Sequence, residues 1–221
     1  MYEKEIEEIF KKLKENLPTI WDGKESILFM KEHNCSQWKQ MEWAGFYFQF
    51  MWENILGKND FMKIPGPKYG NVEFDGFKNI PWDFKAHSAK INATNNFKIP
   101  TNGYNEIKMA LNEYGSVGFI IINGFCEYDD DKQSFKKWHD ELKGGTSSYE
   151  TNRIKRGAPS RIRKINFKPY EINFVFVDNS NIDSCGKFQN NFRNSNGTPR
   201  KTKVMLDLNK NDKLKIFRYN F

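Results

Sequence analysis

Cysteine and histidine are scarce in this sequence, and their positions follow no recognisable spacing. Of the 221 residues, three are Cys and three are His. Cys35, Cys126 and Cys185 are far apart and form no Cys-x-x-Cys pair. This pattern implies neither a disulfide framework nor a thiolate zinc site. We expect the three thiols to be buried or chemically inert.

Long hydrophobic runs are absent as well. The longest apolar runs cover residues 118–122 and 174–177, whereas a membrane-spanning helix needs roughly 20 apolar residues. Residues 1–12 mix acidic and basic side chains and lack the apolar stretch and the cleavage site of a secretory signal. We therefore expect a soluble, cytoplasmic protein that does not associate with membranes.

Core-forming residues, by contrast, are plentiful. The chain is 38% hydrophobic and 16% aromatic, which excludes wholesale disorder, and its length suits a single domain over residues 1–221. The apolar patterns predict helices over residues 2–17, 25–31, 36–56, 104–114 and 133–142, and strands over 72–76, 81–87, 118–127, within 162–177, over 204–208 and over 214–219. We expect an α/β (α+β) fold with a mixed central β-sheet flanked by helices.

Positive charge is concentrated in the last third of the chain. The formal net charge is +7. Twelve Lys and Arg residues between positions 153 and 203 stand against only Glu171, Asp178 and Asp183. A solubilising face usually intersperses both signs, so this imbalance favours a surface that binds a polyanion.

Two acids and a lysine are the residues most suggestive of chemistry. In the strand predicted over residues 81–87, alternation places Asp83 and Lys85 on the same face. Pairing with residues 72–76 across a tight connection brings Asp75 beside Asp83. Clustered carboxylates repel each other unless a cation lies between them, and Mg²⁺ is the natural occupant of such an oxygen site. A neighbouring lysine can stabilise charge on a phosphate, so these residues favour phosphodiester hydrolysis.

This pattern resembles the PD-(D/E)xK nuclease superfamily, whose members include most type II restriction endonucleases. The first acid of the family motif corresponds to Asp75, and its (D/E)xK tripeptide corresponds to Asp83-Phe84-Lys85. The resemblance implies a restriction-endonuclease-like core with the acids on adjacent strands. It also implies Mg²⁺, for which Mn²⁺ would substitute, held by Asp75, Asp83 and the backbone carbonyl of Phe84.

Many members of the superfamily add a glutamate from a preceding helix. Glu42 and Glu53 are the candidates on the helix predicted over residues 36–56, and Glu42 is the first choice because Ala44 and Gly45 would allow that part of the helix to approach closely. The sequence departs from the family in having no proline beside the first acid. Glu73 shares the face of Asp75, which leaves the identity of the first acid open. The competing interpretation is an exposed hairpin with ordinary surface charges.

The basic region supplies residues suited to bind DNA. Lys and Arg neutralise phosphates, whereas Asn, Gln and Arg can also read base edges. The residues expected to contact DNA are Arg153, Lys155, Arg156, Arg161, Arg163, Gln189, Asn191, Arg193, Asn194, Asn196, Arg200, Lys201 and Lys203. On composition alone, the segment over residues 188–200 could equally be a disordered polar loop.

These expectations combine into one functional hypothesis. The chain would be a Mg²⁺-dependent, sequence-specific endonuclease of double-stranded DNA, similar to type II restriction enzymes and acting as a homodimer in a prokaryotic cell or phage. Its parts would be N-terminal helices over residues 1–57, a catalytic hairpin and core over 70–145, and a DNA-contacting region over 146–221. The alternatives are a structure-directed or repair nuclease of the same fold and a DNA-binding protein without catalysis.

Overall fold

The computed structural model describes residues 2–89, 98–157, 161–189, 198–199, 201–209 and 212–221. Its helices are α1 Glu3–Asn16, α2 Gly23–Glu32, η1 Ser36–Lys39, α3 Trp43–Ile55, η2 Lys58–Asp60, α4 Tyr104–Tyr114, α5 Ser134–Leu142 and α6 Ser148–Lys155. Its strands are β1 Trp21–Asp22, β2 Lys68–Tyr69, β3 Val72–Glu73, β4 Gly76–Lys78, β5 Ile80–Ala89, β6 Lys98–Gly103, β7 Ser116–Phe125, β8 Asn166–Asp178, β9 Gly186–Gln189, β10 Lys203–Asp207 and β11 Lys215–Asn220. Within these residues, no helix has both the length and the apolar character needed to cross a membrane.

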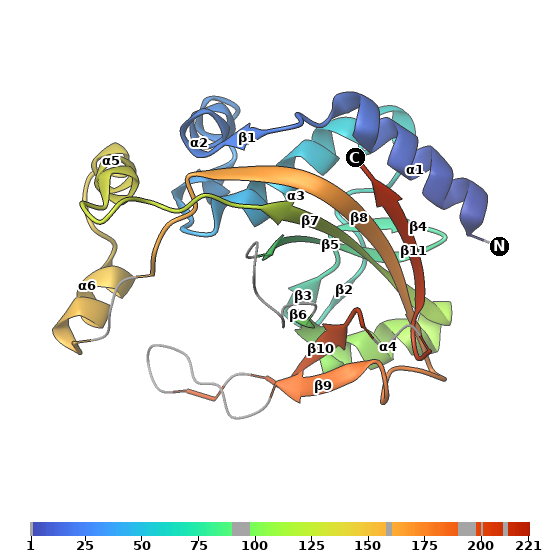
Figure 1. Cartoon of the computed structure of the whole chain (residues 1–221). Coiled ribbons are helices and arrows are strands. Elements are labelled where there is room, and N and C mark those ends of the chain that lie inside the picture. The colour runs from blue at the N-terminus through green and yellow to red at the C-terminus, as the bar shows by residue number, and fades with distance from the viewer. Residues whose placement is uncertain (1, 90–97, 158–160, 190–197, 200, 210–211) are drawn as a thin grey trace.

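A curled mixed sheet runs through the middle of the molecule (Figure 1). Its strands follow the order β1-β8-β7-β5-β4, and β11 pairs with β8. Strands β5 and β7 are parallel, whereas the other neighbours are antiparallel. Parallel neighbours need a crossover connection, and the segment containing β6 and α4 provides it. The mixed central sheet with flanking helices that the sequence predicts is confirmed.

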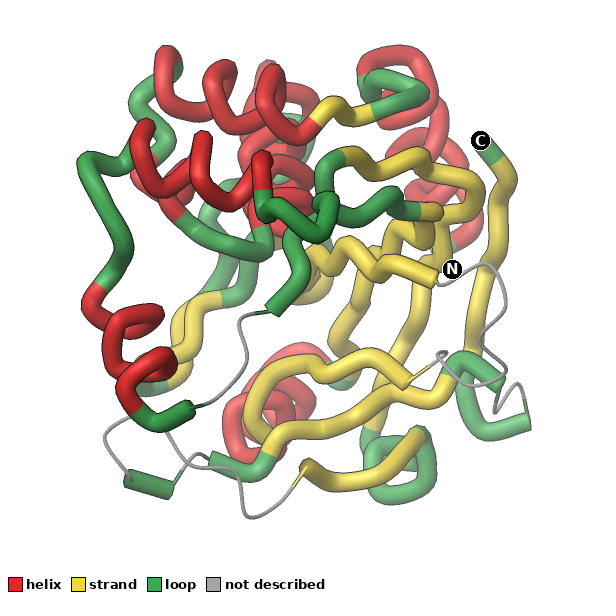
Figure 2. Tube along the Cα trace, turned by 60° about the vertical axis from the view of Figure 1, so that its left-hand side comes forward, coloured by secondary structure: helices red, strands yellow, loops and turns green. Residues whose placement is uncertain are grey.

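Apolar side chains pack on both faces of this sheet. On one face, Ile120 and Ile122 of β7 join a core that includes residues of α1, α2 and α3. On the other face, Phe119 and Ile121 join a second core with α4 and the small sheet β6-β10-β9. Figure 2 shows most of the helices gathered on one side of the strands. Because β7 is buried on both faces, its sequence is a continuous apolar run without alternation.

The helix predicted over residues 36–56 is two elements in the structure. After η1 ends, Gln40 has an extended backbone with φ −76° and ψ 143°, and α3 begins only at Trp43. The indole Nε1 of Trp43 donates a hydrogen bond of 2.8 Å to the backbone carbonyl of Lys164. This contact ties the start of α3 to the segment that precedes β8.

Helix α6 lies where the apolar pattern predicts only a polar, basic segment. Its N-cap is Ser147, whose hydroxyl accepts a hydrogen bond of 3.2 Å from the backbone N–H of Glu150. A Ser followed three residues later by Glu is typical of a helix start. The sequence therefore contains a signal for α6 in its capping residues, although it lacks one in its hydrophobic periodicity.

Gly118 of β7 lies against a buried tryptophan ring, which gives a prediction about stability. A Cβ atom on Gly118 would come within 2.2 Å of Cε3 of Trp82, and Trp82 is fully buried. Gly118→Ala is therefore expected to lower the free energy of unfolding by about 1–3 kcal/mol through overpacking, as measured by denaturant titration. Gly45→Ala is a matched control because no atom lies within 4 Å of the added methyl. It should stabilise α3 by about 0.5–1 kcal/mol, and equal stabilities of the two variants would contradict the packing argument.

Candidate functional site

The hairpin formed by β4 and β5 places two acids next to each other. Gly76 pairs with Trp82 in an antiparallel register, and the strands are joined at Asn79, whose φ is +59°, a conformation that asparagine tolerates better than most residues. Asp75 directly precedes β4, and its carboxyl lies close enough to that of Asp83 for the charge of Asp83 to raise its pKa. The hairpin thus brings together the two carboxylates that the sequence pattern singles out.

Both carboxylate oxygens of Asp75 accept hydrogen bonds. Oδ1 accepts from Nε2 of Gln49 in α3 at 2.7 Å, and Oδ2 accepts from the backbone N–H of Phe84 at 2.7 Å. The N–H and the carbonyl of one strand residue point to the same edge of the strand, so the Phe84 carbonyl also faces Asp75. The rings of Trp52 and Phe84 stack with centroids 4.1 Å apart, which fixes α3 against β5.

Asp83 is almost fully buried and makes two polar contacts. Its exposed fraction is 3%. Its Oδ2 forms an ion pair with Nζ of Lys85, which lies two residues further along β5 and therefore on the same face. Its Oδ1 accepts a hydrogen bond of 3.1 Å from Nδ2 of Asn102 in β6. A buried carboxylate is stable only when it is paired, and Lys85 meets that need here.

The surroundings of Asp75 and Lys85 shift the pKa values of both groups. Burial, together with the negative charge of Asp83, raises the pKa of the Asp75 carboxyl well above its usual range. Burial by itself would lower the pKa of Lys85, but the charges of Asp83 and Asp75 outweigh it and raise that pKa. Lys85 is therefore protonated at neutral pH and acts as a hydrogen-bond donor.

The donor atoms at this point of the fold suit a hard divalent cation. Asp75, Asp83 and the Phe84 carbonyl offer only oxygen, as Mg²⁺ prefers, and Mg²⁺ commonly takes one or two carboxylates and keeps several waters. Burial and the charge of Asp83 raise the pKa of Asp75, and a cation bound between the two carboxyl groups would lower it by favouring the ionised form. Over the part of the chain that the structure describes, no three or more His, Cys, Asp or Glu side chains form a metal-binding group. The residues present fit Mg²⁺ if carbonyl oxygen and water complete its ligands.

A pocket of about 400 Å³ opens beside Asp75. Its lining includes Gln49 and Glu53 of α3 and Glu73, the residue at the end of β3. The helix glutamate that shares a pocket with Asp75 is thus Glu53, which the sequence offers as the alternative. Glu42 lies eleven residues earlier in the chain, about 16 Å away if measured along a continuous helix.

Glu42 pairs with the basic segment that precedes β8. Its Oε2 lies 2.7 Å from Nζ of Lys164, and its Oε1 lies 3.8 Å from Nη1 of Arg161. The structure therefore does not bring Glu42, the first choice from the sequence, to the pair of acids. That choice assumed one unbroken helix, whereas α3 begins one residue after Glu42.

The basic residues expected to contact DNA divide between two parts of the fold. Arg153 and Lys155 lie in the last turn of α6, and Arg156 follows directly. Arg161 is mostly exposed, with 59% of its side chain accessible. Arg163 differs from the others because only 5% of it is exposed.

The remaining predicted DNA contacts lie in β9, in β10 or between these two strands in the sequence. Gln189 is the last residue of β9, and Lys203 is the first of β10. Lys201 forms an ion pair with the buried carboxylate of Glu106 in α4. Asn191, Arg193, Asn194, Asn196 and Arg200 lie outside the described residues.

Gln49 and Asn102 contact the two acids although the sequence pattern does not assign them a role. Gln49 precedes Glu53 by four residues on α3 and hence shares its helix face, a spacing that could have identified it. Asn102 reaches Asp83 from a different sheet, and no local pattern indicates that contact.

Comparisons of the chain with protein-family models, with curated proteins and with solved structures found no match. Function is therefore inferred from the residues and contacts described above.

Proposed function

We propose that this protein is a Mg²⁺-dependent endonuclease that hydrolyses phosphodiester bonds of double-stranded DNA at specific sequences, in the manner of type II restriction enzymes of the PD-(D/E)xK superfamily. The observation that carries the proposal is the closeness of the Asp75 and Asp83 carboxyl groups at the hairpin of β4 and β5, with Lys85 on the same face as Asp83. Ordinary surface charges on an exposed hairpin would not leave Asp83 only 3% exposed. Burial of two neighbouring acids is costly, which favours a functional reason for keeping both.

The side chains around the acids have separable roles in such a reaction. Held by Asp75, Asp83 and the Phe84 carbonyl, Mg²⁺ would supply Lewis acidity at the scissile phosphate and lower the pKa of an attacking water. Gln49 and the Phe84 amide orient the Asp75 carboxylate in advance. The protonated Lys85 can donate to phosphate oxygens as negative charge builds up on them.

A homodimer follows from the need to cut both strands. One copy of the site cleaves one strand, and two copies related by a twofold axis address both strands of a palindromic sequence. The basic residues of α6 and β10 would then contact the duplex, mostly through phosphates. Sedimentation velocity with and without a duplex measures the number of copies, and twice the chain mass is the expected result.

Cleavage of supercoiled plasmid tests the proposal directly. We expect discrete linear fragments with Mg²⁺ or Mn²⁺ and no cleavage with Ca²⁺ or EDTA. A smear of products would favour a nonspecific or repair nuclease of the same fold. Retarded but intact plasmid in every metal would favour a DNA-binding protein without catalysis and would contradict the proposal.

The two helix glutamates give a matched pair of variants. Glu53→Gln removes a carboxylate from the pocket beside Asp75, where it can hydrogen-bond water or a ligand of the metal, so we expect the single-turnover cleavage rate to fall about ten- to a hundredfold. Glu42→Gln makes the same chemical change outside that pocket and should leave the rate at saturating DNA within about twofold of wild type, because no step of the chemistry uses Glu42. A large loss of rate in Glu42→Gln with normal cleavage by Glu53→Gln would reverse the assignment.

A further inference from the structure

A second pocket, of about 700 Å³, lies apart from the paired acids. It is formed by the residues between η1 and α3, by the turn that joins α5 to α6, and by the segment that precedes β8. Figure 1 shows α5 and α6 beyond one end of the main sheet. Among the described residues that line this pocket, Lys39, Lys143, Arg161 and Arg163 are basic and Glu150 is acidic.

Arg163 is the unusual member of this lining. It is 5% exposed, and no described residue accepts a hydrogen bond from its Nη1. Burial lowers the pKa of its guanidinium, and the charge of Glu150 partly opposes that effect. A buried cationic donor without an acceptor is unfavourable, and an oxyanion bound in the pocket that Arg163 lines could supply one.

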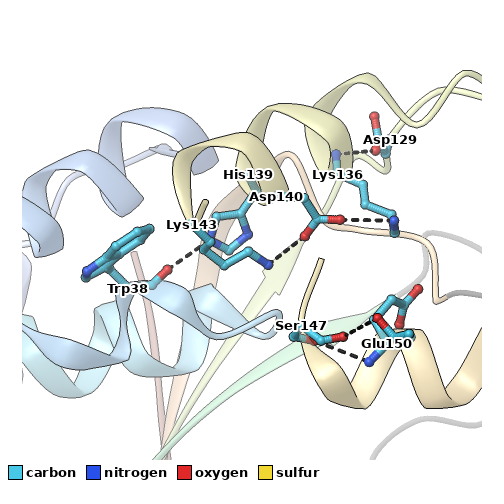
Figure 3. Close-up of polar contacts among 9 residues, drawn as sticks. Trp38, Asp129, Lys136, His139, Asp140, Lys143, Ser147 and Glu150 are labelled. Atoms are coloured by element: carbon cyan, nitrogen blue, oxygen red, sulfur yellow. Dashed lines mark hydrogen bonds and ion pairs between the residues drawn. The ribbon is translucent and has the colours of Figure 1, made fainter. Parts of the chain in front are cut away.

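The other charges around the pocket leave a positive balance. Lys143 pairs with Asp140 of α5 at 2.7 Å (Figure 3), and buried Glu150 contributes one negative charge that acts on Arg163. Lys39 is exposed, and the carboxylate contact of Arg161 is long, at 3.8 Å to Glu42. The pocket therefore has one buried basic group, Arg163, whose Nη1 lacks an acceptor among the described residues. It also has two basic groups that are accessible from solvent, Lys39 and Arg161.

Among the described residues, the pocket shares no lining residue with the pocket beside Asp75. Strand β5 leads from Asp83 to Ala89 toward the end of the sheet near α5 and α6, and six strand residues span about 20 Å. That length corresponds to roughly six base-pair steps of 3.4 Å along a duplex. A group bound in the pocket would thus belong to a part of the ligand remote from the cleaved bond.

We propose that this pocket, formed around Arg163, Lys39 and Arg161, binds a phosphate group of the DNA backbone several base pairs from the cleavage site. The inference rests on the proposed function for the identity of the ligand, and on the lining of the pocket for its chemistry. Arg suits this role because its planar guanidinium can donate two hydrogen bonds to one phosphate. The contact would position the duplex without reading its sequence.

Arg163→Gln and Lys39→Gln test the pocket. The affinity for a duplex is measured in Ca²⁺ over a series of salt concentrations. We expect each variant to bind about tenfold more weakly on every sequence, with a slope of log affinity against log salt that is smaller by about one unit. Lys39 is exposed, so its variant keeps the test valid if Arg163→Gln lowers the melting temperature.

Lys215→Gln is the matched control. It removes the same charge as Lys39→Gln from an exposed position on β11, and it should change neither the affinity nor the salt slope. Unchanged affinity and slope in both pocket variants would overturn the proposal. Weaker binding in Lys39→Gln and in the control alike would also overturn it, because the loss would then reflect net charge alone.

Two further measurements separate this pocket from the proposed activity and identify the source of the phosphate. If the protein binds DNA through Lys39 and Arg163 but never cleaves it, the nuclease proposal fails and the pocket stands. If the protein binds no duplex, inorganic phosphate and deoxynucleoside monophosphates are added and the melting temperature is recorded. A rise in wild type that both pocket variants lack would support a phosphate pocket but overturn DNA as its source, and no rise would overturn the pocket itself.

Discussion

The Asp83→Asn protein is expected to bind duplex DNA at least as tightly as wild type and to cleave none of it. The substitution keeps the size of the side chain and can keep the contact with Asn102, but it removes one of the two charges that would hold the metal. The substitution also removes a negative charge that would repel a nearby phosphate, so the affinity for DNA should be equal to or higher than that of wild type. Cleavage in Mg²⁺ and fluorescence anisotropy in EDTA measure the two effects.

The same variant reports metal binding without any turnover. At a Ca²⁺ concentration of 100 times Kd, we expect the melting temperature of wild type to rise by about 5–10 °C, and that of Asp83→Asn not to change. Asp22→Asn is the control, because Asp22 caps α2 by accepting hydrogen bonds from the N–H groups of Lys24 and Glu25, and Asn caps a helix equally well. Cleavage at a normal rate by Asp83→Asn would remove Asp83 from the catalytic site.

Replacement of Lys85 by Met is expected to slow cleavage by about two to four powers of ten while the fold is retained. Met approximates the length and apolar reach of Lys but cannot donate to a phosphate oxygen. The loss should appear in the rate at saturating DNA, because the amine acts on charge that develops during the reaction. Single-turnover kinetics with Mg²⁺ in excess measures that rate.

Lys136→Met provides the control for Lys85→Met. Lys136 of α5 also forms a half-buried ion pair, with Nζ 3.1 Å from Oδ2 of Asp140, but it lines neither the pocket beside Asp75 nor the phosphate pocket. Its loss should cost a little stability and leave the cleavage rate unchanged. If both variants cleave at the wild-type rate, Lys85 serves only to neutralise Asp83.

The pairing of the two acids could be predicted from the sequence because its cause is local. Both acids belong to one short stretch of chain that turns back at Asn79. The strand expected over residues 72–76 is nevertheless divided, because Val72–Glu73 pairs with β2 and only Gly76–Lys78 pairs with β5. The apolar neighbours Phe74, Trp82 and Phe84 are buried in the structure, as expected for a hairpin drawn into the core.

The sequence could not decide between Glu42 and Glu53 because the start of α3 depends on a distant contact. Trp43 and Lys164 are 121 positions apart in the chain, and their hydrogen bond lies where α3 begins. Hydrophobic periodicity treats residues 36–56 as one helix and so cannot register the break at Gln40. The preference for Glu42 over Glu53 assumed that unbroken helix, and element boundaries are where pattern-based assignment is weakest.

The basic region shows a different limit of sequence reasoning. Charge counting places Arg161 and Arg163 in the same basic stretch of sequence, but it cannot show that one is exposed and the other buried. Nor can it add Lys39 and Lys143, which lie outside the basic run and reach the same pocket only through the packing of η1 and α5. Solvent exposure and spatial grouping are decided by tertiary structure.

The locality of the acid pair also affects how the protein folds. A hairpin closes within microseconds, whereas parallel pairing with β7 must wait for the crossover through β6 and α4. We therefore expect Asp75 and Asp83 to meet early, when Lys85 supplies a local counter-charge but Asn102 of β6 has not yet reached Asp83. The energetic cost of burying the acid pair should then slow folding as well as lower the final stability. Divalent cations that bridge the pair would then accelerate refolding, so the feature that suits the site to phosphate chemistry makes the folding rate sensitive to the ions in solution.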